Sequence, residues 1–329
     1  MVIPLLHNDV AIGSLLLAST RVGAFTDLDV DATMSISGFV SALVGTHFQL
    51  SALLTDMLNR GEQHDRHSTT RFLASVMAPE GAETHRLEEC MDALLANPEN
   101  VSAVFQPIID LASGETVGFE GLSRFPAEMG LSPAQWFGTA LRVRRGIALE
   151  LAALHTIVTA ARAIPPEYGL AVNLSPAAVL DPAIRDMLVA EDRTLTVEIT
   201  EHEPFPEDLA AALQPLRDRG ILVAVDDAGA GYASFTQLLR LRPDVIKIDG
   251  ELVAGIDTDP VKRALVTALV ALAAELNADT VAEAIETEGQ ADVLRRMGIR
   301  RGQGFHLGPP RALADLVIPP IDGRGRTAP

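Results

Sequence analysis

Cysteine is almost absent from this chain, and aromatic residues are scarce. The 329 residues include one cysteine, Cys90, so that no intramolecular disulfide and no cysteine-based metal cluster can form. This content is typical of a reducing compartment, and we expect a cytoplasmic protein. Because only 4% of the residues are aromatic, the core is expected to consist mainly of Leu, Val, Ile and Ala.

Positive charge and long apolar runs are lacking as well. The formal net charge is -18 and the isoelectric point about 4.8, which excludes non-specific binding to DNA or to an anionic membrane, because both need a basic face. No apolar run approaches the roughly 20 residues of a transmembrane helix, and we expect no signal peptide. An anionic ligand would therefore need local cations, either metal ions or individual side chains. The only two lysines are Lys247 and Lys262.

The first 98 residues differ in pattern from the rest. Short strands are predicted at residues 3–7 and 10–18, and a helix that follows them runs towards Leu58. This hairpin and helix resemble the last part of a GAF sensory domain, an α+β fold. We therefore expect a partial GAF-like segment at 1–57 and a helical linker at 58–98. The alternative is a generic hairpin and helix that pack on a partner.

From residue 101 onwards, short strands alternate with helices. Eight strand-like units are predicted at residues 103–110, 116–124, 170–174, 195–200, 222–227, 245–249, 280–285 and 302–306. Helices are predicted between most of them, at residues 133–164, 207–219, 232–239, 259–276 and 289–297. This alternation predicts an α/β fold, a (β/α)₈ TIM-like barrel, over residues 99–315 and leaves 316–329 as a disordered tail. Because the turn at 113–115 is too short for a helical crossover, one strand should run antiparallel.

Polar residues stand at or near the carboxyl ends of the predicted strands, where the active site of such a barrel lies. They are Glu120, Asn173, Glu198, Asp226, Asp227, Lys247, Glu283 and Gln303. Five carboxylates converging on one rim need cations to offset their charge. All-oxygen ligands favour Mg²⁺ or Mn²⁺, and adjacent aspartates can serve two ions, as in phosphodiester hydrolysis.

Ordered motifs in this half of the chain carry a family resemblance. They lie at residues 105–108, 120–124, 172–175, 198–201, 226–232, 247–249, 283–287 and 303–305. Together they make residues 100–312 resemble an EAL domain, the family of cyclic di-GMP phosphodiesterases. The resemblance implies hydrolysis of cyclic di-GMP to linear pGpG with two divalent metal ions, Mg²⁺ or Mn²⁺.

The resemblance also implies a role for each matching residue. One metal ion would be held by Glu120, Asn173, Glu198 and Asp226, and the second by Asp226 and Asp227. Catalytic roles would fall to Glu283, which binds metal or water and is a candidate general base, to Lys247, which orients the attacking water, and to Gln303, which positions Glu283 or the water. Substrate would be bound by Gln106 and Arg124, and support would come from Glu201, Glu286 and Asp249.

Several of these roles have simpler alternatives. Glu201 and Glu286 are either supports of the metal shell and the loop after the fifth strand, or ordinary surface charges. Asp249 either supports the site or caps a helix, and Gln106 either binds substrate or is a satisfied polar group within a strand.

The sequence departs from the common EAL pattern at three places, and each expected ligand survives there. Gly121 replaces the alanine of Glu-Ala-Leu, Ala228 and Ala230 replace a phenylalanine and a threonine in the loop after the fifth strand, and Ala284 replaces a glycine. The first hypothesis is thus an active phosphodiesterase, regulated by the N-terminal region in a homodimer. The alternative is a catalytically inactive EAL domain that acts as a cyclic di-GMP receptor or a protein-interaction module.

Overall fold

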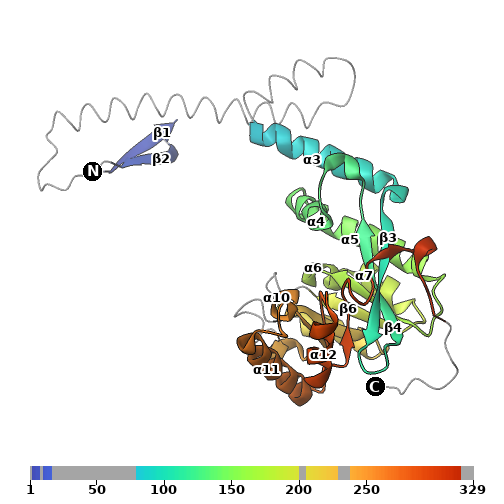
Figure 1. Cartoon of the computed structure of the whole chain (residues 1–329). Coiled ribbons are helices and arrows are strands. Elements are labelled where there is room, and N and C mark those ends of the chain that lie inside the picture. Colours follow the sequence, from blue (N-terminus) through green and yellow to red (C-terminus); the bar gives the residue numbers. More distant parts are fainter. Residues whose placement is uncertain (1, 8–9, 17–78, 200–204, 229–237, 320–329) are drawn as a thin grey trace, which may run out of the picture. The chain divides into compact units, whose positions relative to one another are not determined.

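The computed structural model describes residues 2–7, 10–16, 79–199, 205–228 and 238–319, and the chain forms two compact units, 1–90 and 91–329 (Figure 1). In the first unit, β1 (Val2–His7) and β2 (Val10–Leu16) pair antiparallel, as predicted. The predicted helix towards Leu58 lies outside the described residues, and a GAF-like segment is not confirmed. Helix α3 (Pro79–Ala96) lies in the predicted linker.

The second unit contains a closed eight-stranded barrel, which confirms the predicted fold class. Its strands are β3 (Ser102–Asp110), β4 (Thr116–Arg124), β5 (Gly169–Leu174), β6 (Leu195–Ile199), β7 (Leu222–Ala228), β8 (Val245–Ile248), β9 (Asp279–Ala282) and β10 (Arg301–Gly302). From β4 to β10 each strand pairs parallel with the next, and β10 closes the barrel by pairing antiparallel with β3. The predicted antiparallel strand is β3.

The tight turn between β3 and β4 follows from local chemistry. The Asp110 carboxylate accepts hydrogen bonds from the backbone N–H groups of Ala112 and Ser113, and Gly114 adopts a left-handed conformation with φ of 74°. A short strand that was not predicted, β11 (Arg311–Ala312), pairs antiparallel with the other edge of β3.

Helices accompany the strands along the second unit. They are α4 (Pro133–Arg142), α5 (Gly146–Ala161), α6 (Pro176–Leu180), α7 (Pro182–Val189), α8 (Leu209–Arg217), α10 (Gly250–Val253), α11 (Pro260–Leu276) and α12 (Glu288–Arg296). The helix predicted at 232–239 falls almost entirely outside the described residues. In the part of the chain that the structure describes, no helix has the length and apolar character needed to cross a membrane.

The single helix predicted at 133–164 is wrong, because the structure divides it into α4 and α5. Arg144 takes a left-handed conformation with φ of 57°. The next N–H, of Arg145, donates to the carbonyl of Ala140 at 2.7 Å, and the N–H of Arg144 donates to Leu141 at 3.1 Å. These two bonds are the Schellman arrangement that ends a helix. Glycine usually occupies this left-handed position, so an arginine there gave no signal.

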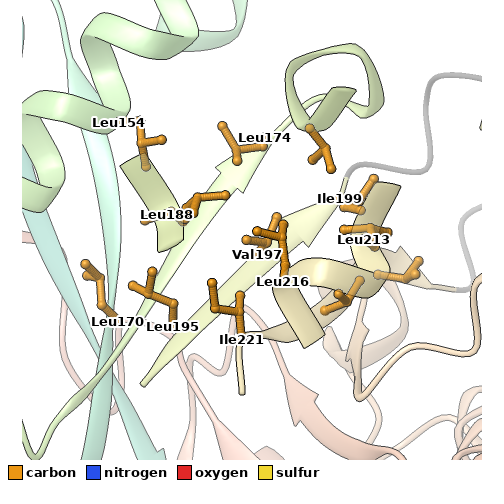
Figure 2. Packing of buried hydrophobic residues seen from close by; sticks show 14 of the residues in the cluster. Leu154, Leu170, Leu174, Leu188, Leu195, Val197, Ile199, Leu213, Leu216 and Ile221 are labelled. Atoms are coloured by element: carbon orange, nitrogen blue, oxygen red, sulfur yellow. The ribbon is translucent and has the colours of Figure 1, made fainter. Parts of the chain in front are cut away.

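The helices and the outer face of the strands share an apolar core. Along β6, Leu195, Val197 and Ile199 point outwards, and Figure 2 shows Val197 and Ile199 beside Leu216 and Leu213 of α8. All five side chains are fully buried. Each contributes roughly 1.5–3 kcal/mol to the free energy of folding, so this layer holds the barrel strands in register.

The barrel interior changes character along the strands. In the first half of β7 and at the start of β8, Ala224 and Val245 form a small buried apolar cluster with Val281 of β9. Two residues beyond Val245, towards the carboxyl end of β8, stands Lys247. The interior is therefore packed with apolar side chains at one end and is polar at the other.

The segment after the barrel is partly ordered. Leu316 and Ile318 pack against the core, and the Tyr168 hydroxyl donates a hydrogen bond of 2.6 Å to the carbonyl of Pro319. The predicted disordered tail thus includes residues that contact the barrel as far as Pro319, and residues 320–329 lie outside the described part.

Candidate active site

Lys247 lies at the centre of a cluster of carboxylates inside the barrel. Its Nζ atom lies 2.6 Å from Glu283, 2.7 Å from Glu198 and 3.0 Å from Asp226. A fourth carboxylate, Glu120, is 3.7 Å away. The Lys247 side chain is 2% exposed, so these interactions are shielded from bulk water.

Two amides connect the carboxylates to one another. Asn173 donates a hydrogen bond of 2.6 Å to one oxygen of Glu120, and Gln303 donates one of 2.7 Å to the other. The same amide nitrogen of Gln303 donates to Glu283 at 3.2 Å. Both carboxylate oxygens of Glu120 therefore accept a hydrogen bond. Gln303, directly after β10, connects that end of the barrel to Glu120 of β4.

The register of the paired strands explains why residues distant in sequence meet here. Asn173 lies directly opposite Glu198 on the neighbouring strand, and Gln106 lies opposite Glu120. Because alternate residues of a strand face the same side, the residues between them point into the helical layer.

Strand β7 departs from regular pairing at the adjacent aspartates. Val225 pairs with Ile246 and Ala228 pairs with Ile248. Between these two pairs β7 advances by three residues and β8 by only two, so β7 contains one extra residue. The irregularity falls on Asp226 and Asp227. A bulge of this kind changes the direction of a side chain, and it lies beside the carboxylate cluster.

Burial and charge shift the proton affinities of this cluster in different directions. Burial, together with the charge of Glu120, raises the pKa of Glu198 well above its ordinary value. Burial also raises the pKa of Glu283 to about 7, although Lys247 opposes the rise. The pKa of Glu120 is lowered, because Lys247 and the hydrogen bonds of Gln303 and Asn173 outweigh its burial.

Lys247 itself remains a cation. Burial would lower the pKa of its ammonium group, but the negative charges of four carboxylates raise that pKa well above the ordinary value. The site therefore combines one buried positive charge with carboxyl groups of unequal acidity, an arrangement often found where protons move.

A cavity adjoins this cluster at the carboxyl end of β4. It has a volume of about 230 Å³ and is lined by residues of β4, β5, α4 and α5, including Arg124, Asn173, Phe137 and Glu150. Arg124 is half-buried, and its guanidinium donates to the carbonyl of Ser123 at 2.9 Å. Arg124 thus places a cation at the carboxyl end of β4.

The sequence matches a family model across this whole region. Residues 88–310 match the model described as the EAL domain. The chain belongs to the EAL domain family. Strand β4 carries the family's signature glutamate as Glu120, which lies inside the cluster described above.

Similar proteins include named phosphodiesterases. The chain is 29% identical over 245 residues to the probable cyclic di-GMP phosphodiesterase PdeG of Escherichia coli (strain K12), covering 70% of this chain and 48% of that protein. The chain therefore spans about half the length of this curated relative.

Two solved structures of EAL proteins are also similar. The MucR phosphodiesterase in complex with cyclic di-GMP, from a protein of Pseudomonas aeruginosa, is 27% identical, with a TM-score of 0.60 and coverage of 70% of this chain and 100% of that chain. The calcium and cyclic di-GMP complex of Klebsiella pneumoniae BlrP1 is 28% identical, with a TM-score of 0.55 and coverage of 78% and 69%.

Within this EAL domain, other predicted site residues lie apart from the cluster or outside the described part. Asp249 caps helix α10, because its carboxylate accepts a hydrogen bond of 2.8 Å from the N–H of Glu251. Glu286 is exposed, and Gln106 is buried and donates to the carbonyl of Gly308 at 3.2 Å. Glu201 lies outside the described residues, and only the backbone of Asp227 is described.

The donor chemistry of the EAL cluster suits a hard divalent cation. Its carboxylate and amide oxygens are the ligands that Mg²⁺ and Mn²⁺ prefer, and the Oε1 atom of Gln303 is buried and accepts no hydrogen bond. The arrangement is nevertheless closed around an ammonium group. Among the described residues, no three Asp, Glu, His or Cys side chains are placed so that they could hold a metal ion.

Two further residues position the site and were not assigned this role from sequence. A Cβ atom on Gly304 would lie 2.1 Å from the backbone nitrogen of Ile285. Only glycine at position 304 therefore allows the backbone next to Gln303 to approach Ile285 this closely. Ala284 has φ of 48°, a left-handed conformation, directly after Glu283. The dipeptide Gln303-Gly304 was the available signal for the first, and the glycine that Ala284 replaces in the common EAL pattern was the signal for the second.

Proposed function

We propose that this EAL domain hydrolyses cyclic di-GMP to linear pGpG in a reaction that depends on two divalent metal ions, Mg²⁺ or Mn²⁺. The observation that carries the proposal is the set of four carboxylates around Lys247, together with Asn173 and Gln303, in the barrel interior. The named activity of the relatives and the cyclic di-GMP in two similar solved structures support the same substrate.

The metal ions would be held by residues on neighbouring strands. The proposed ligands are Glu120, Asn173, Glu198, Asp226, Asp227 and Glu283. When bound, the ions supply Lewis-acid stabilisation of charge on the phosphodiester and lower the pKa of a nucleophilic water. Four of these carboxylates lie within 3.7 Å of the same atom, Lys247 Nζ, which supports a shared cation site.

The remaining side chains would act on the water and the substrate. Glu283, whose pKa is raised to about 7, is suited to accept a proton near neutral pH. Lys247 would orient the attacking water and offset charge as the phosphorus–oxygen bond breaks, and Gln303 would hold Glu283 in place. One water adds across one phosphodiester bond, and the leaving sugar oxygen takes up a proton.

Substrate binding would use the cation at the mouth of the barrel. Arg124 can hold a phosphate through its guanidinium group, and it lines the 230 Å³ cavity beside the carboxylate cluster. Gln106 would contact the dinucleotide after exchanging its bond to Gly308. In an acidic protein of net charge -18, such local cations are required to attract a phosphodiester.

Regulation is proposed to come from the first 98 residues and from a homodimer. This proposal is supported by a strand pair before α3 and by the resemblance of residues 1–57 to a sensory domain. Glu201 and Glu286 are proposed to support the loop after β7 and the metal shell. Comparing turnover at increasing protein concentration with the mass of the species in solution tests the dimer.

The deciding experiment is a hydrolysis assay with cyclic di-GMP and Mg²⁺ or Mn²⁺. The wild-type chain should form pGpG, and product should disappear with a chelator or in Glu120→Gln. The matched control is Glu288→Gln, which removes an exposed carboxylate paired with His306 and should retain activity. Nucleotide binding without product would instead favour the receptor hypothesis. The next variants would then be Ala228→Phe and Ala230→Thr, which restore the common EAL residues.

A further inference from the structure

Four carboxylates converge on one atom, Nζ of Lys247. It contacts oxygens of Glu283, Glu198 and Asp226 within 3.0 Å, and Glu120 lies 3.7 Å away. These carboxylates come from four different strand ends, and each points at the same atom. The ammonium group therefore occupies the point where their negative charges converge.

The buried carboxylates of this cluster depend on the ammonium group of Lys247 to offset their negative charge. Glu120 and Glu198 are 4% and 2% exposed, so their charges cannot be stabilised by bulk water. In the part of the chain that the structure describes, the ion pairs of Glu120, Glu198 and Glu283 all run to Lys247. Removing the one cation of such a buried group leaves several charges without a partner, which is far more destabilising than removing a surface ion pair.

Metal ions need the same oxygens at shorter distances. Mg²⁺ takes its ligands at roughly 2.0–2.1 Å and has strict octahedral geometry. An ion at that distance from Glu198 and Asp226 would share the space of an ammonium group that is 2.7 and 3.0 Å from those residues, and the two cations would repel each other.

We propose that Lys247 is the resident counter-cation of this carboxylate cluster, and that a divalent metal ion displaces its ammonium group from Glu198 and Asp226. The proposal deepens the proposed function, on which its second half rests. Lys247 then offsets part of the negative charge of the barrel interior in metal-free protein, and metal binding releases the same side chain towards the substrate. The affinity for metal is lower than the oxygen donors alone would give, because the ion competes with an internal cation.

The composition of the chain allows a direct test in unaltered protein. With only Lys247 and Lys262 present, protein labelled with ¹³C at the lysine Cε atoms should give two NMR signals. Lys262 donates instead to the backbone carbonyls of Glu251 and Ala254, and Lys262→Arg assigns its signal. Titration with Mg²⁺ should shift the Lys247 signal and leave that of Lys262 unchanged. A Lys247 signal that stays in place while metal binds by calorimetry would overturn the proposal.

A pair of variants tests the charge itself. In the presence of a chelator, Lys247→Met should lower the midpoint of thermal unfolding by about 10 °C, whereas the matched variant Lys262→Met should change it by only a few degrees. Added Mg²⁺ should then raise the midpoint of Lys247→Met more than that of wild type, and bind it at least about tenfold more tightly. A loss of packing alone would give no such metal-dependent rescue.

The outcomes separate this proposal from the proposed activity. If Lys247→Met gains no more from Mg²⁺ than wild type does, the counter-cation role is wrong even where wild type produces pGpG. If wild type produces no pGpG but the Lys247 signal responds to Mg²⁺, the counter-cation role stands and the proposed activity fails.

Discussion

The two faces of strand β6 both carry fully buried side chains, and those side chains differ completely in chemistry. Leu195, Val197 and Ile199 face the helices and are fully buried in the apolar core (Figure 2). Glu198, on the opposite face of the same strand, is 2% exposed and contacts Lys247. Burial of the first set stabilises the fold, whereas burial of Glu198 raises its pKa well above the ordinary value, because ionisation there is costly.

This difference separates stability from function along one strand. Apolar contacts on the outer face hold the strand in register, and that register aligns the charged inner face with Asn173 of β5. The folding free energy gained by burying apolar side chains on the outer face can therefore offset the cost of burying charged groups on the inner face. A substitution on one face should therefore leave the property set by the other face unchanged.

The largest effect is expected from Glu198→Gln. The variant should lose activity by about 10³-fold, because a proposed metal ligand becomes neutral. Its stability in chelator should be equal to or higher than that of wild type, since one of four clustered carboxylates no longer repels its neighbours. Steady-state kinetics and urea unfolding measure the two quantities. Equal activity would remove Glu198 from the catalytic machinery.

The opposite face should give the opposite result. Leu195→Ala should lower the free energy of unfolding by about 2–5 kcal/mol, because it leaves a cavity beside the helices. Turnover per folded molecule should change little. Leu195→Met, which nearly preserves volume, is the control and should cost less than about 1.5 kcal/mol. If activity fell while Leu195→Ala remained fully folded, the two faces would not be separable.

The raised pKa of Glu283 predicts a pH dependence of stability without metal. Below its ordinary pKa of 4.5, the folded and unfolded states both hold the proton. As pH rises towards the folded-state value of about 7, only the unfolded state ionises, so the free energy of unfolding falls, by at most about 3 kcal/mol, and is then constant. Urea unfolding in chelator at pH 5 and pH 8 measures the fall. Glu283→Gln should remove this part of it, and an unchanged fall in that variant would contradict the assignment.

The smallest effect concerns backbone strain next to the cluster. Ala284 has a left-handed backbone with φ of 48°. The methyl group of Ala284 also lies close to Gly250, where an added Cβ atom would be 2.7 Å away from it. Ala284→Gly should relieve the left-handed strain and raise the free energy of unfolding by about 0.5–1 kcal/mol, after the greater flexibility of glycine in the unfolded chain is counted. Ala282→Gly, on the preceding buried strand position, is the control and should be destabilising. A loss of stability in Ala284→Gly would show that the methyl group contributes to packing.

Sequence patterns predicted the barrel because its strands alternate regularly with helices and repeat over 200 residues. The same patterns failed where the deciding contact was local and unusual. Arg144 ends α4 in a left-handed conformation without glycine, and the bulge at Asp226 and Asp227 depends on pairing with β8. Asp249 was assigned to support the site or to cap a helix, and it caps α10.

The prediction of the site was limited for a different reason. Polar residues at strand ends could be identified one strand at a time, because each interrupts an apolar run. The central place of Lys247 depends on four carboxylates that lie on other strands, and their distances follow from closure of the barrel. The roles assigned to all of these residues stay predictions, and Glu201 and the side chain of Asp227 lie outside the described part of the structure.

Closure of the barrel also sets the time at which the site can exist in a growing chain. Strand β10 joins β3 through Arg301 opposite Asp110 and Gly302 opposite Ile109, and Gln303 bonds to Glu120 across 183 positions of sequence. During synthesis, Glu120, Glu198 and Lys247 emerge from the ribosome well before the strand that completes their surroundings. Until then these groups can remain hydrated, and their burial is delayed to a final step that the whole barrel undergoes together.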